Sequence, residues 1–191
     1  MNEKQIVLAG GCFWGMEKLY RGLPGVLDAT AGYANGDTED HADYETVCTG
    51  RTGFRESLYL RYDPAQISLG QLLFFYFAVI DPTMFNRQGM DIGTQYQTGV
   101  YWLDKETEAE VLAVAAMERA ARREFYVELK PLENFYPAEE YHQRYLEKNP
   151  DGYCHISPAK MAALRRYPYR EEAYTVPAAQ LLAAYRKQAE E

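Results

Sequence analysis

Cys12 is the residue with the clearest capacity for chemistry, and it lies in the segment 11–15, which reads GCFWG. The apolar run 5–9 precedes a pair of glycines that can turn the chain sharply, and apolar residues then recur at helical spacing. We therefore expect Cys12 at the start of a helix, where unpaired N–H groups and the helix dipole favour a thiolate. Phe13 and Trp14 are expected to form an apolar wall beside the sulfur. This motif alone also fits a structural cysteine in a tight turn.

Further stretches of the chain combine tyrosines, acidic residues and glycines with a second cysteine. They are residues 32–36 (GYANG), 44–48 (YETVC), 52–56 (TGFRE), 86–96 (NRQGMDIGTQY) and 152–155 (GYCH). Together with the Cys12 motif, and in this order, they resemble the class A peptide methionine sulfoxide reductases from residue 6 to residue 155.

The resemblance implies an enzyme, a peptide-methionine (S)-S-oxide reductase that repairs oxidised proteins and also takes free methionine sulfoxide. It implies no metal and no cofactor. A sulfoxide oxygen is a poor leaving group, so a thiolate needs a proton donor and hydrogen bonds at that oxygen. By similarity, Phe13 and Trp14 would also pack on the terminal methyl of the substrate.

The resemblance also assigns the polar groups of the site. Glu56 would be the acid, kept protonated near neutral pH by a partly apolar site. Tyr44 and Tyr96 would hydrogen-bond the sulfoxide oxygen, and Asp91 would hold a water or polar network. Taken singly, each residue has a plainer reading, because the chain contains 17 tyrosines and most tyrosines pack. Only their joint occurrence on the family pattern favours catalysis.

The reaction would leave Cys12 as a sulfenic acid, which condenses readily with a second thiol. The resemblance makes Cys154 that resolving thiol and thioredoxin the reductant of the resulting disulfide. Cys48 matches a non-essential cysteine of relatives. No cysteine follows Cys154, so the cycle is expected to be a two-cysteine relay.

The chain departs from the family pattern near two of these residues. Phe54 and Arg55 stand where many relatives have His-Ala before the catalytic glutamate, and Met90 and Ile92 replace commoner polar residues. If Arg55 turned toward the carboxylate, it would lower the pKa of Glu56.

Local patterns predict the elements that must position these residues. Strands are expected at 5–9, 26–32, 56–62, 98–103 and 125–129, and helices from about 13 to 23 and at 69–80, 106–123, 138–148 and 177–189. Ser68 is expected to cap the second helix. Residues 83–97 are expected to form a long functional loop.

This order predicts an α+β fold, a ferredoxin-like split βαβ two-layer sandwich with an irregular C-terminal segment and an added C-terminal helix. Residues 1–155 are expected to form the catalytic domain. Residues 156–191 are expected to be an extension packed on the same domain, with the last helix near the Cys154 segment.

Composition narrows the partners and the setting. The net charge of −8 repels phosphate backbones and anionic membranes, so neither nucleic acid nor a membrane is an expected partner. No signal segment or span of about 20 apolar residues is evident. A cytoplasmic protein is therefore expected, and we expect a monomer. Three cysteines are too few and too scattered for a disulfide-stapled secreted fold, so reduced thiols are expected.

Other functions remain open at this point. A thiol peroxidase could use the same Cys12 to Cys154 relay, and a binding module could use the abundant aromatic residues as a recognition surface. A cysteine hydrolase would need a histidine beside Cys12, and His142 is the one candidate, although a solvated helical histidine is the simpler expectation. Three scattered histidines do not predict a metal site.

Overall fold

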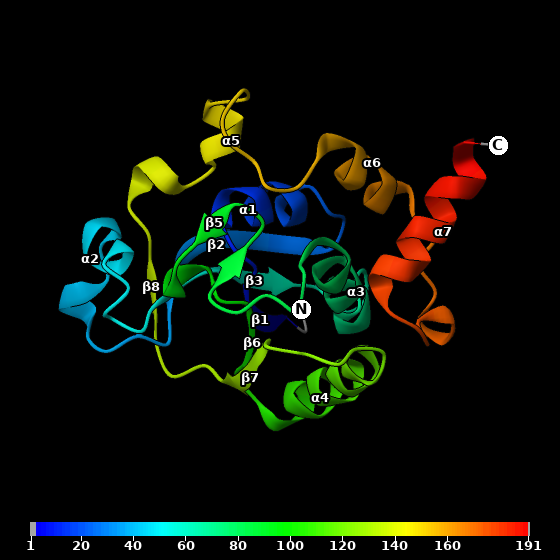
Figure 1. Ribbon diagram of the computed structural model, residues 1–191, viewed down its shortest axis with the longest axis horizontal. Coiled ribbons are helices and arrows are strands. Elements are labelled where there is room, and N and C mark those ends of the chain that lie inside the picture. The colour runs from blue at the N-terminus through cyan, green and yellow to red at the C-terminus, as the bar shows by residue number, and fades with distance from the viewer. Residues whose placement is uncertain (1–2, 191) are drawn as a thin grey trace.

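A six-stranded sheet lies at the centre of the molecule (Figure 1). The computed structural model describes residues 3–190. The strand order is β7-β6-β1-β3-β2-β8, and every neighbouring pair is antiparallel except β6 and β7. The strands are β1 (Lys4–Ala9), β2 (Val26–Ala34), β3 (Arg55–Tyr62), β6 (Gly99–Trp102), β7 (Glu128–Pro131) and β8 (Phe135–Pro137).

Two helices connect the four central strands. Helix α1 (Phe13–Arg21) joins β1 to β2, and both of these strands pair with β3, so the connection passes over one intervening strand. Helix α3 (Leu69–Val79) joins β3 to β6 by way of a long loop. The α+β class is therefore confirmed. The sheet is larger than the expected ferredoxin-like sandwich, because β7 and β8 extend its two edges.

The main core lies between the sheet and the helices. Ile6 and Leu8 of β1 and Leu58 and Leu60 of β3 are fully buried against this helical layer, as the alternation of side chains along strands requires. On the other face, the segment that connects β7 to β8 covers a smaller cluster around Val7. The sheet is therefore covered on both faces, but helices cover only one of them.

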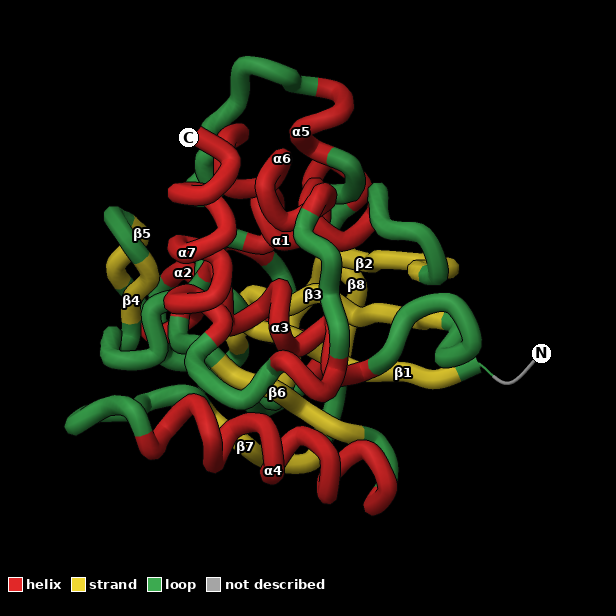
Figure 2. The backbone as a smooth tube through the Cα atoms, turned by 90° about the vertical axis from the view of Figure 1, so that its right-hand side faces the viewer, coloured by secondary structure: helices red, strands yellow, loops and turns green. Residues whose placement is uncertain are grey.

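Helix α3 is buried along almost its whole length, which explains why it is apolar on every side. Ser68 caps it as expected, since its hydroxyl oxygen accepts a hydrogen bond of 3.1 Å from the backbone N–H of Gln71. Figure 2 shows α3 among the other helices, with α7 (Ala178–Glu190) beside it and α4 (Lys105–Ala120) along the β6 and β7 edge.

The last part of the described chain folds back on this helical layer. A helix that the sequence patterns missed, α6 (Pro158–Arg166), precedes α7, and Leu164 and Leu182 from these helices belong to the main core. Glu118 of α4 is fully buried and accepts hydrogen bonds from the Tyr174 hydroxyl (2.7 Å) and the Ala178 N–H (2.8 Å). A division of the chain after residue 155 remains a prediction.

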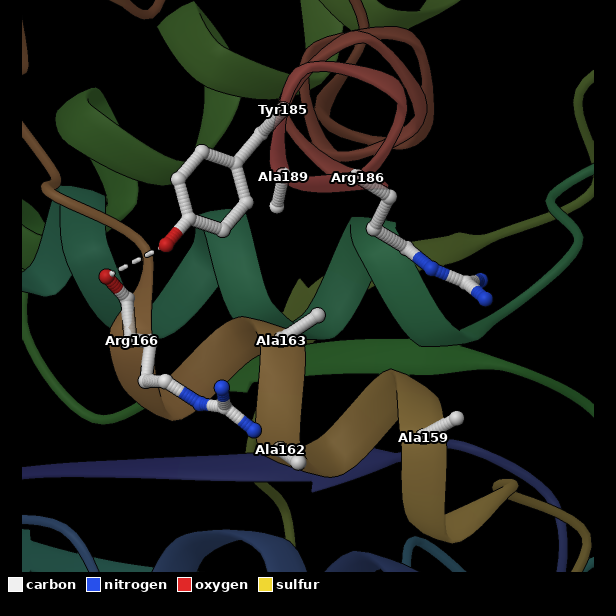
Figure 3. Close-up of a pocket in the computed structure, with 7 residues that line it drawn as sticks. All are labelled: Ala159, Ala162, Ala163, Arg166, Tyr185, Arg186 and Ala189. Carbon is white, nitrogen blue, oxygen red and sulfur yellow. Dashed lines mark hydrogen bonds between the residues drawn. The ribbon is translucent and has the colours of Figure 1, made fainter. Parts of the chain in front are cut away.

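Figure 3 shows a hollow between α6 and α7. Alanines from both helices line much of it, and the Tyr185 hydroxyl donates a hydrogen bond of 3.1 Å to the Arg166 carbonyl at one side. None of the residues expected to carry chemistry lines it.

The structure corrects two predicted elements. The last predicted strand begins later, at Glu128. The helix predicted at 138–148 is replaced by a 3₁₀ turn (Glu140–His142) and a short helix, α5 (Tyr145–Lys148), because Arg144 between them adopts a left-handed φ of 54°.

The long loop at 83–97 also contains local structure. It forms the two-stranded hairpin β4 (Arg87–Gln88) and β5 (Asp91–Ile92), followed by a 3₁₀ turn at Thr94–Tyr96. A further short helix, α2 (Tyr44–Cys48), was not expected from the sequence and lies at the opposite end of the molecule from α7 (Figure 1). Within residues 3–190, no helix combines the length and the apolarity needed to cross a bilayer.

Candidate active site

Cys12 lies at the junction of β1 and α1, as the sequence predicts. It is the residue that caps α1, and its side chain is buried, with 7% of the residue exposed. Gly11 immediately before it has a left-handed φ of 80°. A Cβ at Gly11 would also lie 2.7 Å from the Cβ of Gln88, so this turn requires glycine on both counts.

The pKa of Cys12 is shifted in the direction opposite to the one that its place at a helix start predicts. The N–H groups of Trp14 and Gly15 do favour the thiolate, but burial of the sulfur and the nearby Glu56 carboxyl outweigh them and raise the pKa of Cys12. Desolvation of a buried thiolate raises the pKa of Cys12 by more than the helix dipole lowers it. Burial therefore favours the protonated thiol at Cys12.

Glu56 lies next to this thiol at the beginning of β3, opposite Tyr33 of β2. Only 2% of it is exposed, and its Oε2 accepts a hydrogen bond of 3.1 Å from the Phe13 N–H. Burial raises the pKa of Glu56 to about 8, with smaller contributions from the carboxylates of Asp91 and Glu139. At neutral pH the group is therefore a neutral acid, in the range that suits a proton donor.

Arg55 does not perturb this carboxyl. Successive residues of a strand point to opposite faces, and the guanidinium of Arg55 forms two hydrogen bonds to Glu128, of 3.3 and 3.0 Å. The other departures from the family pattern are also separate from the acid. Phe54 is buried in an aromatic cluster, whereas Met90 and Ile92 are exposed on the β4–β5 hairpin.

Tyr44 and Tyr96 border the same centre from two different elements. Tyr44 is the first residue of α2, and Tyr96 ends the 3₁₀ turn after the hairpin. Burial raises the pKa of both hydroxyls, and Glu56 and Cys12 are among the neighbours that add to the shift. Both hydroxyls thus stay protonated and available as donors.

Asp91 also belongs to this group, since its charge raises the pKa of both Cys12 and Glu56. Its carboxylate accepts a hydrogen bond of 3.0 Å from the Tyr153 hydroxyl. The polar network expected at Asp91 therefore includes Tyr153, which the sequence patterns did not single out. This contact ties the β4–β5 hairpin to the segment that carries Cys154.

Phe13 and Trp14 form an aromatic wall with other rings, and its contact with a substrate stays a prediction. Trp14 stacks on Tyr145, with ring centroids 3.7 Å apart, and its indole N–H donates a hydrogen bond of 3.0 Å to Nδ1 of His142. Phe13 is buried and also contacts the His142 ring, at 5.0 Å between centroids. The wall is therefore held by a histidine 128 residues further along the chain.

His142 is not the solvated helical histidine that was expected. It is 1% exposed, in the 3₁₀ turn before α5, and burial lowers its pKa. Nδ1 accepts the bond from Trp14, so the neutral ring carries its proton on Nε2, which lies 3.6 Å from a Glu139 oxygen and has no hydrogen-bond partner among the described residues. It is therefore not free to act as the base of a cysteine hydrolase.

Glu139 is a further residue that the sequence did not indicate. Its carboxylate accepts a bond of 2.8 Å from the Tyr33 hydroxyl and one of 2.8 Å from the Tyr44 N–H. It thereby fixes the start of α2 beside the buried acid. No local signal marks this residue, because its partners are far away in the sequence.

Cys154 lies against the first turn of α1. A Cβ at Gly15 would be 3.2 Å from its Sγ, and the thiol donates a hydrogen bond of 3.1 Å to the Ile156 carbonyl. Burial raises the pKa of Cys154. The thiol also lines a groove of about 380 Å³, together with Lys18 and Arg165.

The three cysteines are free thiols in this structure. Cys48 is exposed at the end of α2 and lies close to Tyr44. Over residues 3–190, no cluster of three or more histidine, cysteine and acidic side chains is arranged to hold a metal ion.

Comparisons with known proteins place this geometry in context. A family model described as peptide methionine sulfoxide reductase matches residues 4–172. A curated relative from Clostridium acetobutylicum, named peptide methionine sulfoxide reductase MsrA, is 51% identical over 158 residues, which is 80% of this chain and 94% of the relative.

Solved structures agree in fold. Mxr1 from Saccharomyces cerevisiae in its reduced form has a TM-score of 0.76 and 38% identity, covering 81% of this chain and 91% of that one. The structure of Mxr1 in complex with Trx2 has a TM-score of 0.53 and 29% identity, covering 75% of this chain and 84% of that one.

Proposed function

Since this chain belongs to the peptide methionine sulfoxide reductase family, whose reaction reduces methionine sulfoxide to methionine, we propose that Cys12 is the nucleophile and Glu56 the acid of that reaction. The observation that carries this proposal is the pairing of two buried groups. A neutral carboxylic acid with a pKa of about 8 lies beside a buried thiol at the start of a helix.

In the first step, Cys12 attacks the sulfoxide sulfur while Glu56 protonates the departing oxygen. The hydroxyl then passes to the Cys12 sulfur as the S–O bond of the substrate and the transient bond between the two sulfurs break, so methionine leaves and Cys12 becomes a sulfenic acid. The thiol proton of Cys12 replaces the one that Glu56 gives up. Tyr44 and Tyr96 donate hydrogen bonds to the oxygen, which stabilise its developing charge. Phe13 and Trp14 receive the terminal methyl group and favour the S epimer. Asp91 and Tyr153 hold the polar rim of the site.

In the second step, Cys154 attacks the Cys12 sulfenic acid, forming one intramolecular disulfide and one water molecule. An external dithiol then reduces the disulfide. Two observations support thioredoxin as this dithiol. The relative Mxr1 has been solved in complex with Trx2, and Cys154 in this chain faces an open groove. Repair of oxidised proteins follows if peptide substrates reach the aromatic wall.

The first test of the proposal is turnover of a methionine sulfoxide peptide supplied separately as its S and R epimers. Reduction of the S epimer alone is expected, with either dithiothreitol or a thioredoxin system, because the wall and the oxygen donors fix one configuration at sulfur. The readout is methionine peptide formed, separated by chromatography. Equal reduction of both epimers would contradict the assigned geometry.

The same preparation distinguishes a thiol peroxidase, which would use the same two cysteines. We expect hydrogen peroxide to be consumed more slowly than the S sulfoxide at equal concentration. Faster, saturable peroxide consumption would favour the peroxidase instead.

Cys154→Ser should separate the two steps of the cycle. This variant is expected to form about one equivalent of methionine and then stop when thioredoxin is the reductant, because the sulfenic acid at Cys12 has no second thiol to close on. Turnover with dithiothreitol should continue, since a small thiol can reach the sulfenic acid directly. The measurement is methionine formed per enzyme in rapid quench and steady-state assays.

Cys48→Ser is the matched control, because it removes an exposed thiol outside the proposed relay. It should cycle with thioredoxin at a rate within about twofold of the original protein. Peptide mapping that found Cys48 rather than Cys154 joined to Cys12 would overturn the assignment.

A further inference from the structure

His155 is a partly buried titratable residue that neither step described above uses. It follows Cys154 directly, and its imidazole lies across the turn that carries Cys12. A Cβ built on Gly11 would be 3.7 Å from its Nε2, and a Cβ built on Gly15 would be 2.9 Å from its Nδ1. The ring therefore spans both ends of the GCFWG segment.

The Cys154 thiol also lies close to the His155 ring. The same point beside Gly15 lies 2.9 Å from Nδ1 of His155 and 3.2 Å from Sγ of Cys154. The imidazole and the resolving thiol thus share one small space against the first turn of α1, next to the nucleophile.

Both ring nitrogens are buried, and in the described part of the chain neither has a hydrogen-bond partner. A buried polar group without a partner typically lowers the stability of the fold by about 1–3 kcal/mol. An imidazole with two such nitrogens is therefore not explained by a contribution to stability. The Gly10 carbonyl favours the protonated ring, but its geometry does not make it a partner of either nitrogen.

Gly15 of the motif supports a functional reason. Gly15 lies inside α1 without a left-handed φ, so alanine would favour the helix by up to about 1 kcal/mol. A side chain there would meet His155 and Cys154. Glycine at this position costs the helix some stability, but it leaves room for the His155 ring and the Cys154 thiol.

We propose that His155 is the proton-transfer residue of the step in which Cys154 closes the disulfide with Cys12. This inference rests on the proposed two-cysteine cycle. The imidazole accepts the proton of the Cys154 thiol as its sulfur attacks, and a proton returns from the imidazolium to the oxygen that leaves Cys12. The S–O bond breaks, the S–S bond forms, and the products are a disulfide, one water molecule and a neutral imidazole.

The charges around the ring fit this role. Burial lowers the pKa of His155 below its usual value, against an opposing influence from Asp91 of β5 and with a small addition from Lys160 of α6. The ring is accordingly neutral at pH 7 and able to accept a proton. Its neighbours in its own segment are Tyr153 and Cys154, whose pKa is raised, so the thiol ionises little without a base.

His155→Asn tests the proposal by removing the titratable ring while keeping a polar side chain of similar shape. One equivalent of methionine should still form in a single turnover, which reports the first step. Disulfide formation, followed by quenched thiol alkylation and mass spectrometry, should slow by about 10²-fold, the usual contribution of a positioned general base.

The pH dependence separates proton transfer from simple packing. In the unmodified protein, the rate of disulfide formation should fall on the acid side of the usual histidine range, because burial lowers the pKa of His155 and the protonated ring cannot accept a proton. In His155→Asn this limb should vanish, and the rate should instead climb with pH as Cys154 ionises. Added imidazole should restore part of the rate in His155→Ala.

His41→Asn is the matched control, since His41 is exposed and pairs with Asp37 away from Cys154. It should leave both rates and both pH profiles unchanged. A disulfide rate in His155→Asn that equals the original rate at every pH would overturn the proposal.

If both His155 variants fail to fold, measurements on the unmodified protein still test the proposal. Its disulfide step should show a solvent deuterium isotope effect of about 2 and the acid limb described above. The absence of both would overturn the role of His155. Failure to form any methionine would instead overturn the proposed function itself.

Discussion

Cys12→Ser should lower the rate of S-sulfoxide reduction by at least about 10⁴-fold, the scale seen when an enzyme loses its nucleophile. A serine hydroxyl at this position would be a far weaker nucleophile toward sulfur, and it could not form a sulfenic acid. The oxygen of the substrate would then have no acceptor. Burial and Glu56 already hold the pKa of the native thiol above its usual value.

The measurement is methionine formed in a single turnover without any reductant. This assay is independent of recycling, so a loss there cannot arise from the disulfide step. Cys48→Ser provides the matched change at an exposed cysteine and should form one equivalent at a rate within about twofold of the original. Formation of a full equivalent by Cys12→Ser would rule out Cys12 as the oxygen acceptor.

Glu56→Gln should slow the same single turnover by about 10³-fold, because the amide keeps the shape of the side chain but cannot donate a proton to the departing oxygen. The hydrogen bond from the Phe13 N–H can still be accepted by the amide oxygen, so the backbone of the site should be retained. Glu45→Gln, at an exposed position in α2, is the control and should react normally.

The pH dependence of the single-turnover rate tests whether Glu56 acts as the acid. Glu56 has a pKa of about 8, so the protonated form needed for donation is lost as the pH rises through 8. In the original protein the rate should therefore fall above pH 8, and Glu56→Gln should lack this limb. An unchanged high-pH limb in the variant would show that another group is the acid.

Glu56→Gln should raise the free energy of unfolding although it lowers activity. The folded state holds the Glu56 proton up to about pH 8, whereas the unfolded chain loses it near 4.5, so the free energy of unfolding falls as the pH rises between these values. At pH 7 this penalty is on the order of 3 kcal/mol. Glu56→Gln removes the penalty, and its gain in stability should grow from pH 5 to pH 8 in denaturant titrations. A gain independent of pH would contradict the raised pKa.

The sequence by itself determined the elements whose causes are local. The position of Cys12 follows from a buried strand, two glycines and a helical apolar spacing, and each of these acts within a few residues. Ser68 caps α3 for the same reason. The separate motifs around Glu56, Asp91 and Cys154 also sufficed to indicate the family, because they occur in order along one chain.

Only the tertiary structure decided the electrostatics of the site. The helix terminus at Cys12 predicts a lowered pKa, but the direction is reversed by desolvation and by a carboxyl 44 residues away. Arg55 is adjacent to Glu56 in the sequence, yet it is paired with Glu128 on the other side of the sheet. The burial of a charge depends on which distant segments cover it, and no local pattern contains that information.

The same reason explains the residues that sequence patterns did not assign. His142 and Glu139 lie in a stretch that local spacing predicts as one helix, and a left-handed Arg144 that hydrogen-bonds Glu17 of α1 interrupts it. His155 gains its position from two glycines more than 130 residues earlier. Local chain chemistry therefore determined where the nucleophile lies, whereas contacts between distant segments decided its protonation and its neighbours, because desolvation and packing exist only once those segments meet.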